Sequence, residues 1–339
     1  MAARFTRIAI PFLAALASIP SYADSSQAAK RDAALKQIND CLKHNSMPSR
    51  ACRKMNANVD TLVEIYKQGD KTVLPTLLHF TYLIDFYHEA LLADPSGFLA
   101  AVGELPEKDQ RFVADGIAGG MFGIRSKERF EALREVLRNV PESDSANRTS
   151  QLCLKALERR NAEFLLDYFP PQTLTSRAAN FQVRWYSSEM YALGEKPIWF
   201  PSTGDTIYRL TYLPAFQGST VITLTVSPAG NGQIETKSTD GDRRETIVLD
   251  EAAAVPPDQL AKFLALLDQA HFWTTPTELP AGRGLDGATW MMEGVQDGKY
   301  RTVVRWCPIY DHRSADEVSF GHAGQFLFEL AGHAHTGNC

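Results

Sequence analysis

The sequence predicts an α+β protein, with an N-terminal all-α helical domain followed by a C-terminal antiparallel sheet with two helices. Across residues 24–170, apolar residues recur at spacings of three and four, which is the period of amphipathic helices. After residue 171, turn residues separate short runs that are rich in Thr, Tyr, Ile and Val, which favours strands. We therefore expect a helical domain over residues 24–170 and an α+β domain over residues 171–339, with the boundary at Pro170-Pro171.

Residues 1–23 have the pattern of a secretory signal peptide. Arg4 and Arg7 precede an apolar run, and Ser21 and Ala23 are small residues at the first and third positions of a cleavage site, so we expect cleavage after Ala23. The apolar run is shorter than the roughly 20 residues of a membrane-spanning helix, and no later segment reaches that length. The sequence therefore predicts an exported protein, periplasmic or secreted, with no membrane span.

The acidic composition limits the class of partner. The chain has 35 Lys and Arg against 40 Asp and Glu, a net charge of −5, and cleavage after Ala23 removes only positive charges. Nucleic acids and anionic membranes favour basic surfaces. We therefore expect neither of them as a partner, and expect a protein or an envelope component instead.

The helical domain is predicted to consist of short consecutive helices without a fixed repeat period. The segment 71–92 is the most apolar and is the expected central helix. Asp94 before Pro95, and Ser126 before an apolar stripe, have the pattern of helix N-caps. The expected helices cover residues 27–44, 49–68, 71–92, 95–102, 106–118, 126–140 and 150–168.

The α+β domain is predicted to contain four strands, a helix, a two-stranded hairpin and a closing helix. Residues 172–188 have no pattern that we can assign. This order of elements favours an antiparallel sheet with its helices on one face. The expected strands cover residues 205–213, 220–227, 233–237 and 246–249, and the expected helices cover residues 257–270 and 324–331.

Residues 288–306 form the clearest local unit, a β-hairpin that turns at Asp297-Gly298. An Asp-Gly pair between strand-forming runs favours a two-residue turn, because both turn positions need positive φ. The turn fixes the register and places Trp290 opposite Arg305. Directly opposed residues lie on the same face of the sheet.

The two faces of this hairpin differ in composition. The more apolar face includes Met291 and Val304 and is the expected core face. Glu293 lies on that face and would point inward, where a carboxylate is most often found at a sheet edge or paired with an arginine.

The opposite face of the hairpin carries the candidate binding residues Trp290, Arg301 and Arg305. A guanidinium that lies on an indole is a favourable contact, and aromatic and arginine residues are enriched where proteins bind one another. The alternative is that the arginines only cover a sheet face with their alkyl stems.

Residues 284–308, GLDGATWMMEGVQDGKYRTVVRWCP, resemble a segment near the C-terminus of a group of exported bacterial proteins to which no function is assigned. The shared pattern is G-L-D-G-A-x-W-x-x-E-G-x-x-D-G-x-Y-R-x-x-x-R-W-x-P, and the similarity extends over about residues 272–332. The resemblance implies an exported α+β module and brings no catalytic residue with it. Cys307 departs from the pattern, because a Ser or another small residue stands there in such segments.

All five cysteines follow the expected cleavage site, in a compartment where disulfides form. Spacing alone does not determine their pairing. The simplest arrangement joins Cys41 to Cys52 across a helical hairpin, and Cys307 to the C-terminal Cys339. Cys153 would then remain as a buried thiol.

Two groups of polar residues are candidates for chemistry. His333 and His335 could bind zinc or copper together with a thiolate, whereas an ordinary chain end would hold no metal. On the segment 71–92, the side chains of Asp85, His88 and Glu89 lie on neighbouring turns. They could form half of a metal or acid/base site, or only the polar edge of a core helix.

The sequence contains no G-x-S-x-G, H-E-x-x-H, Walker or Rossmann glycine pattern, so the common nucleophile, metalloprotease and nucleotide motifs are absent. No cofactor is expected. The leading interpretation is a non-enzymatic periplasmic binding or envelope-associated protein. The alternative is a metal-dependent or general acid/base hydrolase that acts on an envelope substrate.

Overall fold

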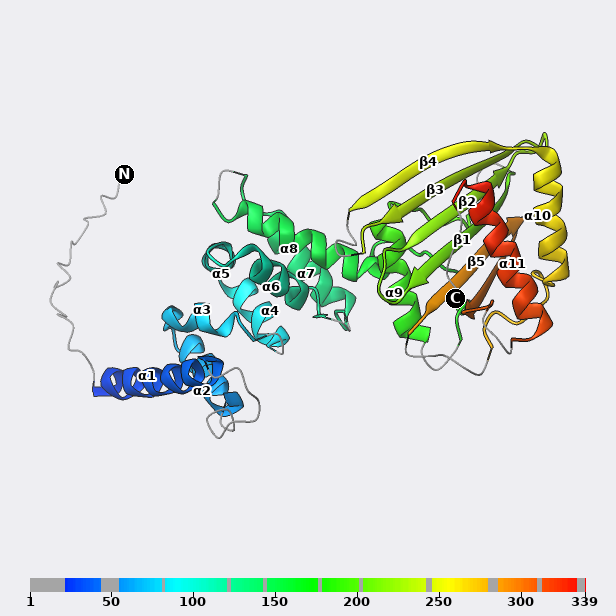
Figure 1. Ribbon diagram of the computed structural model, residues 1–339. Helices are drawn as coiled ribbons and strands as arrows, with labels where there is room; N and C mark the ends of the chain where they lie inside the picture. Colours follow the sequence, from blue (N-terminus) through cyan, green and yellow to red (C-terminus); the bar gives the residue numbers. More distant parts are fainter. Residues whose placement is uncertain are drawn as a thin grey trace, which may run out of the picture. The chain divides into compact units, whose positions relative to one another are not determined.

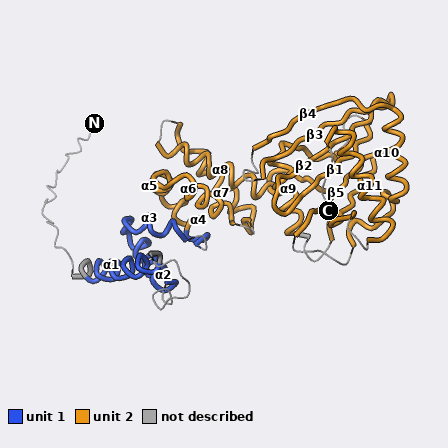
Figure 2. The backbone as a smooth tube through the Cα atoms, viewed as in Figure 1, with its two compact units in different colours: residues 1–86 blue, residues 87–339 orange. Residues whose placement is uncertain are grey.

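The structure, a computed structural model, describes residues 22–43, 55–80, 83–120, 123–142, 145–175, 179–200, 204–241, 246–279, 286–309, 313–333 and 339. The chain falls into two compact units, Met1–Phe86 and Tyr87–Cys339 (Figure 2). Helices dominate its N-terminal part and a six-stranded antiparallel sheet dominates its C-terminal part (Figure 1). The α+β class predicted from the sequence is therefore confirmed.

The first unit is helical. Ile38 and Leu62 are fully buried, so α1 and α2 each contribute an apolar stripe to its core. Most of the predicted signal peptide, residues 1–21, lies outside the described residues. Within the part of the chain that the structure describes, no helix is both long and apolar enough to span a bilayer. The elements of this unit are α1 (Tyr22–Lys43), α2 (Met55–Lys67), η2 (Lys71–Val73) and α3 (Leu74–Leu77).

The expected single helix over residues 71–92 is wrong, because the segment is divided between η2, α3 and α4 (Ile84–Ala93). Beyond α3, the amides of His79 and Phe80 donate to carbonyls three residues back, a spacing that tightens and ends a helical turn. Apolar residues lie on every side of this segment, so one straight helix would expose some of them. The broken path buries most of the large ones, including Leu74, Leu77, Leu78, Phe80, Phe86 and Leu91.

Most helices of the second unit follow the predicted pattern, but the expected helix over residues 150–168 ends at Arg160 and a short 3-10 helix follows it. Asp94 accepts a hydrogen bond from the Gly97 amide, and Ser126 accepts one from the Arg129 amide, as expected of N-caps. The segment that the sequence left unassigned contains α9. These helices are α5 (Pro95–Gly103), α6 (Glu107–Ile117), α7 (Lys127–Arg138), α8 (Asn147–Arg160), η4 (Ala162–Phe164) and α9 (Ala179–Ala192).

The sheet has the strand order β4-β3-β2-β1-β5-β6, and every neighbouring pair is antiparallel. The first four strands follow one another as hairpins, and β5 then returns to the far side of β1. The edges of the sheet are therefore β4, which is labelled in Figure 1, and β6. The strands are β1 (Thr206–Pro214), β2 (Thr220–Val226), β3 (Gly232–Thr239), β4 (Ile247–Val255), β5 (Ala288–Gln296) and β6 (Lys299–Trp306).

The β5–β6 hairpin has the register that the sequence predicts. Trp290 pairs with Arg305, and every other pair out to Gln296 and Lys299 follows in step. Asp297 and Gly298 have φ of 51° and 71°, which is the conformation of the two-residue turn.

Helices cover both faces of the sheet, so the prediction of helices on one face is wrong. One face packs against α10 (Pro257–Gln269) and α11 (Ala315–Leu330), in a core that contains Trp290 and Met292. The other face packs against α9, in a core that contains Met291 and Val304. Helix α9 was missed because its apolar residues do not form a clear stripe.

The core beneath α9 includes residues from both sides of the expected boundary at residues 170–171. Tyr168 and Phe169 share it with Val221 of β2 and Met291 of β5. The boundary between the two compact units lies instead at Phe86–Tyr87.

Candidate functional site

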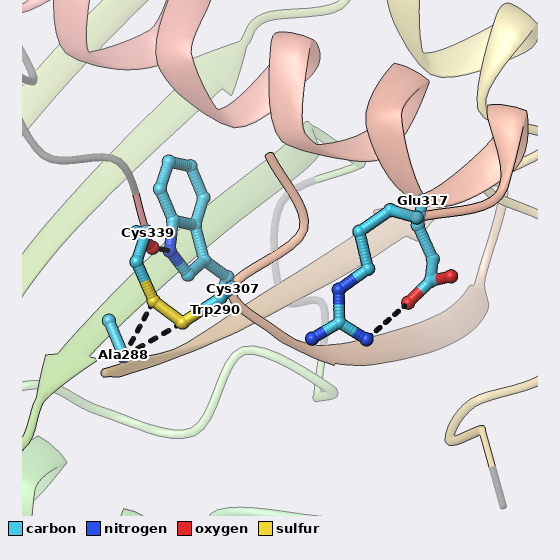
Figure 3. The surroundings of a disulfide bond; sticks show 6 residues. Ala288, Trp290, Cys307, Glu317 and Cys339 are labelled. Carbon is cyan, nitrogen blue, oxygen red and sulfur yellow. Dashed lines mark hydrogen bonds and ion pairs between the residues drawn. A yellow bond between two sulfur atoms is a disulfide. The ribbon is translucent and has the colours of Figure 1, made fainter. Parts of the chain in front are cut away.

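Trp290, the aromatic residue of the predicted binding face, is a core residue. Its side chain is fully buried, and its ring packs edge-on against Tyr212 and Phe328 at centroid distances of 5.5 and 6.0 Å. Its indole N–H donates to the carbonyl of Cys339 (Figure 3). A tryptophan whose ring and N–H are both satisfied inside the protein is not available to a partner.

Arg305 is buried as well, and it fastens a loop to the edge of the sheet. Its guanidinium donates to the carbonyls of Pro276 and Thr277 and to the hydroxyl of Thr275. The backbone amide of Val304 donates to the Thr277 carbonyl at 2.7 Å. Burial lowers the pKa of Arg305. Residues 275–277 therefore cover the edge of β6 at Val304 and Arg305.

The three candidate binding residues do not share an exposed surface. Arg305 lies over the ring of Phe320, with 5.8 Å from its guanidinium carbon to the ring centroid, so the stacking on Trp290 that the hairpin register suggested is not the contact observed. Arg301 is half-buried, and burial lowers its pKa. The physical reason is the coverage of this face by α10 and α11, which a single hairpin does not reveal.

The disulfide between Cys307 and Cys339 confirms one predicted pairing. The Ala288 amide donates to both sulfur atoms (Figure 3). Cys153 is a buried free thiol whose pKa burial raises to about 12. Cys41 is disulfide-bonded, and its predicted partner Cys52 lies outside the described residues.

The candidate histidines do not form a metal site in the described part of the chain. His333 lies 3.7 Å from a carboxylate oxygen of Glu251, and His335 is outside the described residues. His88 is buried and its Nε2 lies 2.8 Å from the carbonyl oxygen of Ile117, whereas Glu89 is exposed. Among the described residues, no group of three or more His, Cys, Asp or Glu could hold a metal ion.

The ion pair of Arg209 and Glu293 is the most deeply buried one among the described residues of the second unit. Arg209 Nε donates to Glu293 at 2.8 Å, and both side chains are fully removed from solvent. Tyr300 donates its hydroxyl to the other carboxylate oxygen of Glu293 at 2.8 Å, and burial together with this carboxylate raises the pKa of Tyr300. The sequence placed Glu293 inward but could not name its partner, because β1 meets β5 only in the folded sheet.

This pair continues toward the surface through a short network. The Arg209 guanidinium also donates to the carbonyl of Lys196 at 2.7 Å and lies 3.5 Å from the carboxylate of Glu195. Glu195 in turn accepts a hydrogen bond from the ammonium group of Lys237 at 2.9 Å. All these charges have partners inside the protein, so the network holds α9 and its following loop on the sheet.

The two edges of the sheet differ in accessibility. Residues 275–277 cover β6, whereas β4 pairs with β3 alone among the described residues. Ile247 and Val248 at the start of β4 are 41% and 61% exposed. An exposed strand edge with free backbone groups and apolar side chains is a template for pairing with another strand.

A shallow groove lies beside the last residues of β4, Ala252 to Ala254. We name it the edge groove. Its volume is about 500 Å³, and its walls are small or uncharged polar residues. The groove does not contain any residue that the sequence singled out. It is lined by Thr225, Ser227, Asn231, Gly232, Gln233, Ala252, Ala253 and Ala254.

The sequence signal for this surface was present but weak. The run Asp250 to Ala254 consists of residues that are uncommon in strands, so the expected strand ended at Leu249, whereas β4 continues to Val255.

No protein-family model matches the chain, and no curated protein matches it.

Proposed function

We propose that the protein is a non-enzymatic binding protein of the bacterial envelope, exported to the periplasm or beyond, which binds an extended polypeptide segment at the edge of β4. The binding mode is strand addition, in which the segment pairs through its backbone with an exposed sheet edge. The observation that carries the proposal is the contrast between the two edges of one sheet. The fold covers part of β6 with a loop, whereas seven of the nine residues of β4 are exposed.

Three features support this function. No described strand pairs with the outer side of β4, so its outward backbone groups can supply hydrogen bonds for an extended segment, whatever its sequence. The exposed side chains of Ile247 and Val248 supply apolar area that a bound strand would remove from water. The signal-peptide pattern of residues 1–23 and the resemblance of residues 284–308 to exported proteins support the location.

The hydrolase alternative has less support. His88 is buried and its ring nitrogen is bonded to a backbone carbonyl, which is the environment of a histidine that stabilises a helix packing. We therefore retain binding as the proposed function.

Hydrogen exchange of the purified chain, with and without the uncharged peptide TVTVTVTVT, tests the proposal. Because a bound strand protects the outward amides of the edge, exchange over residues 247–255 should become slower when the peptide is added. Val248→Lys should abolish the protection, since a charged side chain on an edge strand opposes pairing.

Phe181→Lys is the matched control for this experiment. Phe181 is 49% exposed and lies on α9, away from β4, so this variant should bind the peptide as the parent chain does. If exchange over residues 247–255 is the same at every peptide concentration, strand addition at β4 is not the function.

A further inference from the structure

The partner segment can be described more closely from the side chains around the edge groove. Resting on the proposed function, we infer that the bound segment is basic, with bulky side chains at two alternate positions. The charge of the groove face indicates the first property, and the small side chains of Ala252 and Ala254 on β4 indicate the second.

The face of β4 that borders the groove is acidic. Asp250 is exposed on this face, as is Glu235 on the neighbouring strand. Lys237 pairs with Asp250 across the strands, but its ammonium group is bonded to Glu195 at 2.9 Å. With Lys237 and Glu195 neutralising each other, Asp250 faces a bound strand directly and Glu235 lies one strand further in, so the face favours Lys or Arg opposite Asp250.

The next two residues along the same face leave room for large side chains. Ala252 and Ala254 lie on the groove side, because they pair with the exposed Glu235 and Gln233 of β3. Ala253 has the opposite orientation, since it pairs with the buried Ile234. In a strand, side chains two residues apart share a face, so two alternate residues of the partner would lie over the groove of about 500 Å³.

A second copy of this chain fits the same edge poorly. If β4 paired with itself over its full length in the antiparallel direction, its central residue, Glu251, would oppose the Glu251 of the other copy. Like charges directly opposite each other destabilise a sheet. The Glu251 side chain is 64% exposed and its described ionic neighbour is His333 at 3.7 Å, so the repulsion would be only partly relieved.

Fluorescence anisotropy with three labelled peptides tests the inference on the purified oxidised chain at low salt. The peptides are TKTFTFTKT, its acidic twin TETFTFTET, and the uncharged TVTVTVTVT. The sequences of the two charged peptides read the same forwards and backwards, so the order of side chains along β4 is the same in a parallel and an antiparallel pairing. We expect the lysine peptide to bind about ten-fold more tightly than the glutamate peptide.

Three variants locate the charge preference and the room for bulky side chains. The double variant Glu235→Lys with Asp250→Lys should reverse the preference between the two charged peptides. The control Glu104→Lys with Glu142→Lys changes two exposed carboxylates away from the sheet and should leave the preference unchanged. Ala254→Trp should weaken binding of both phenylalanine peptides while it leaves the uncharged peptide bound.

Each alternative outcome has a distinct meaning. Equal binding of the lysine and glutamate peptides, or a preference that the double variant leaves intact, would overturn the inference while strand addition stands. Binding of none of the three peptides would remove the proposed function itself. A dimer in sedimentation that dissociates on Val248→Lys would identify a second copy as the occupant, and the inference would then be wrong.

Discussion

Arg209 and Glu293 are both charged and both fully removed from solvent. Taking two ions out of water costs several kcal/mol, and their mutual attraction offsets this only with good geometry and further hydrogen bonds. The structure provides a close contact, 2.8 Å from Arg209 Nε to Glu293, and further hydrogen bonds, because Tyr300 donates to Glu293 and the Lys196 carbonyl accepts from Arg209. The desolvation cost of the two charges is therefore offset only while both are present, and removing one would leave the other buried without its counter-charge.

Removal of one partner should be more harmful than removal of both. Glu293→Leu leaves the Arg209 guanidinium without its main counter-charge and should lower the free energy of unfolding by about 3–5 kcal/mol. Arg209→Met combined with Glu293→Leu should recover most of this loss. Urea denaturation of the two variants and the parent chain measures the difference, and a double variant no more stable than Glu293→Leu would contradict this account.

For single residues, the sequence predicted the inward position of Glu293 correctly, because the Asp-Gly turn fixes which hairpin residues share a face. Trp290 shows the limit of the same argument. The turn placed it correctly opposite Arg305, but its burial depends on α11, which is separated from it along the chain. Register is a local property, whereas exposure depends on packing against distant elements.

Among the elements, the β5–β6 hairpin depends on one turn. Gly298 has φ of 71°, and a Cβ built there would meet no atom within 4 Å. The conformation of its backbone is therefore the main reason for a glycine at this position.

Gly298→Ala should test the turn without steric complications. We expect a loss of about 1–2 kcal/mol in the free energy of unfolding, which is the cost of placing an L-residue in the left-handed region. The exposed neighbour offers the control Lys299→Ala, for which we expect a change of only a few tenths of a kcal/mol, about the usual size for surface positions. Equal losses in thermal denaturation would show that the turn conformation is not what stabilises the hairpin.

The elements that the sequence missed or shortened have physical causes. Helix α11 begins nine residues before the expected start, at a capping box in which Ser314 and Glu317 bond each other's backbone. The S-x-x-E pattern at residues 314–317 is the sequence signature of this start. Strand β4 is different, because its alanines and acids have low strand propensity and it forms by pairing with β3.

At the scale of the whole molecule, the disulfide between Cys307 and Cys339 joins the segment after α11 to the sheet. It closes a loop with a sequence separation of 32 residues, which contains α11. It also holds the Cys339 carbonyl against the indole of Trp290. The bond therefore connects one covering helix to the strands beneath it.

Replacing both cysteines should destabilise the protein without changing its fold. Cys307→Ser with Cys339→Ser should lower the free energy of unfolding by about 2–4 kcal/mol, because the unfolded chain regains the freedom of the closed loop. Guanidinium denaturation followed by circular dichroism measures this loss. The single variant Cys339→Ser should match the double variant, and a double variant as stable as the parent would show that packing alone holds α11.

The shared core beneath α9 has a consequence for how this chain can be divided. Tyr168 and Phe169 are buried together with strand residues such as Val221. A fragment that begins after Pro170 would therefore lack these two side chains and expose the apolar residues of the sheet that they cover. Gene recombination that moved only residues 171–339 into another protein would transfer an incomplete interior. The portion that could be inherited intact begins near Tyr87, and it takes several of the helices along with the sheet.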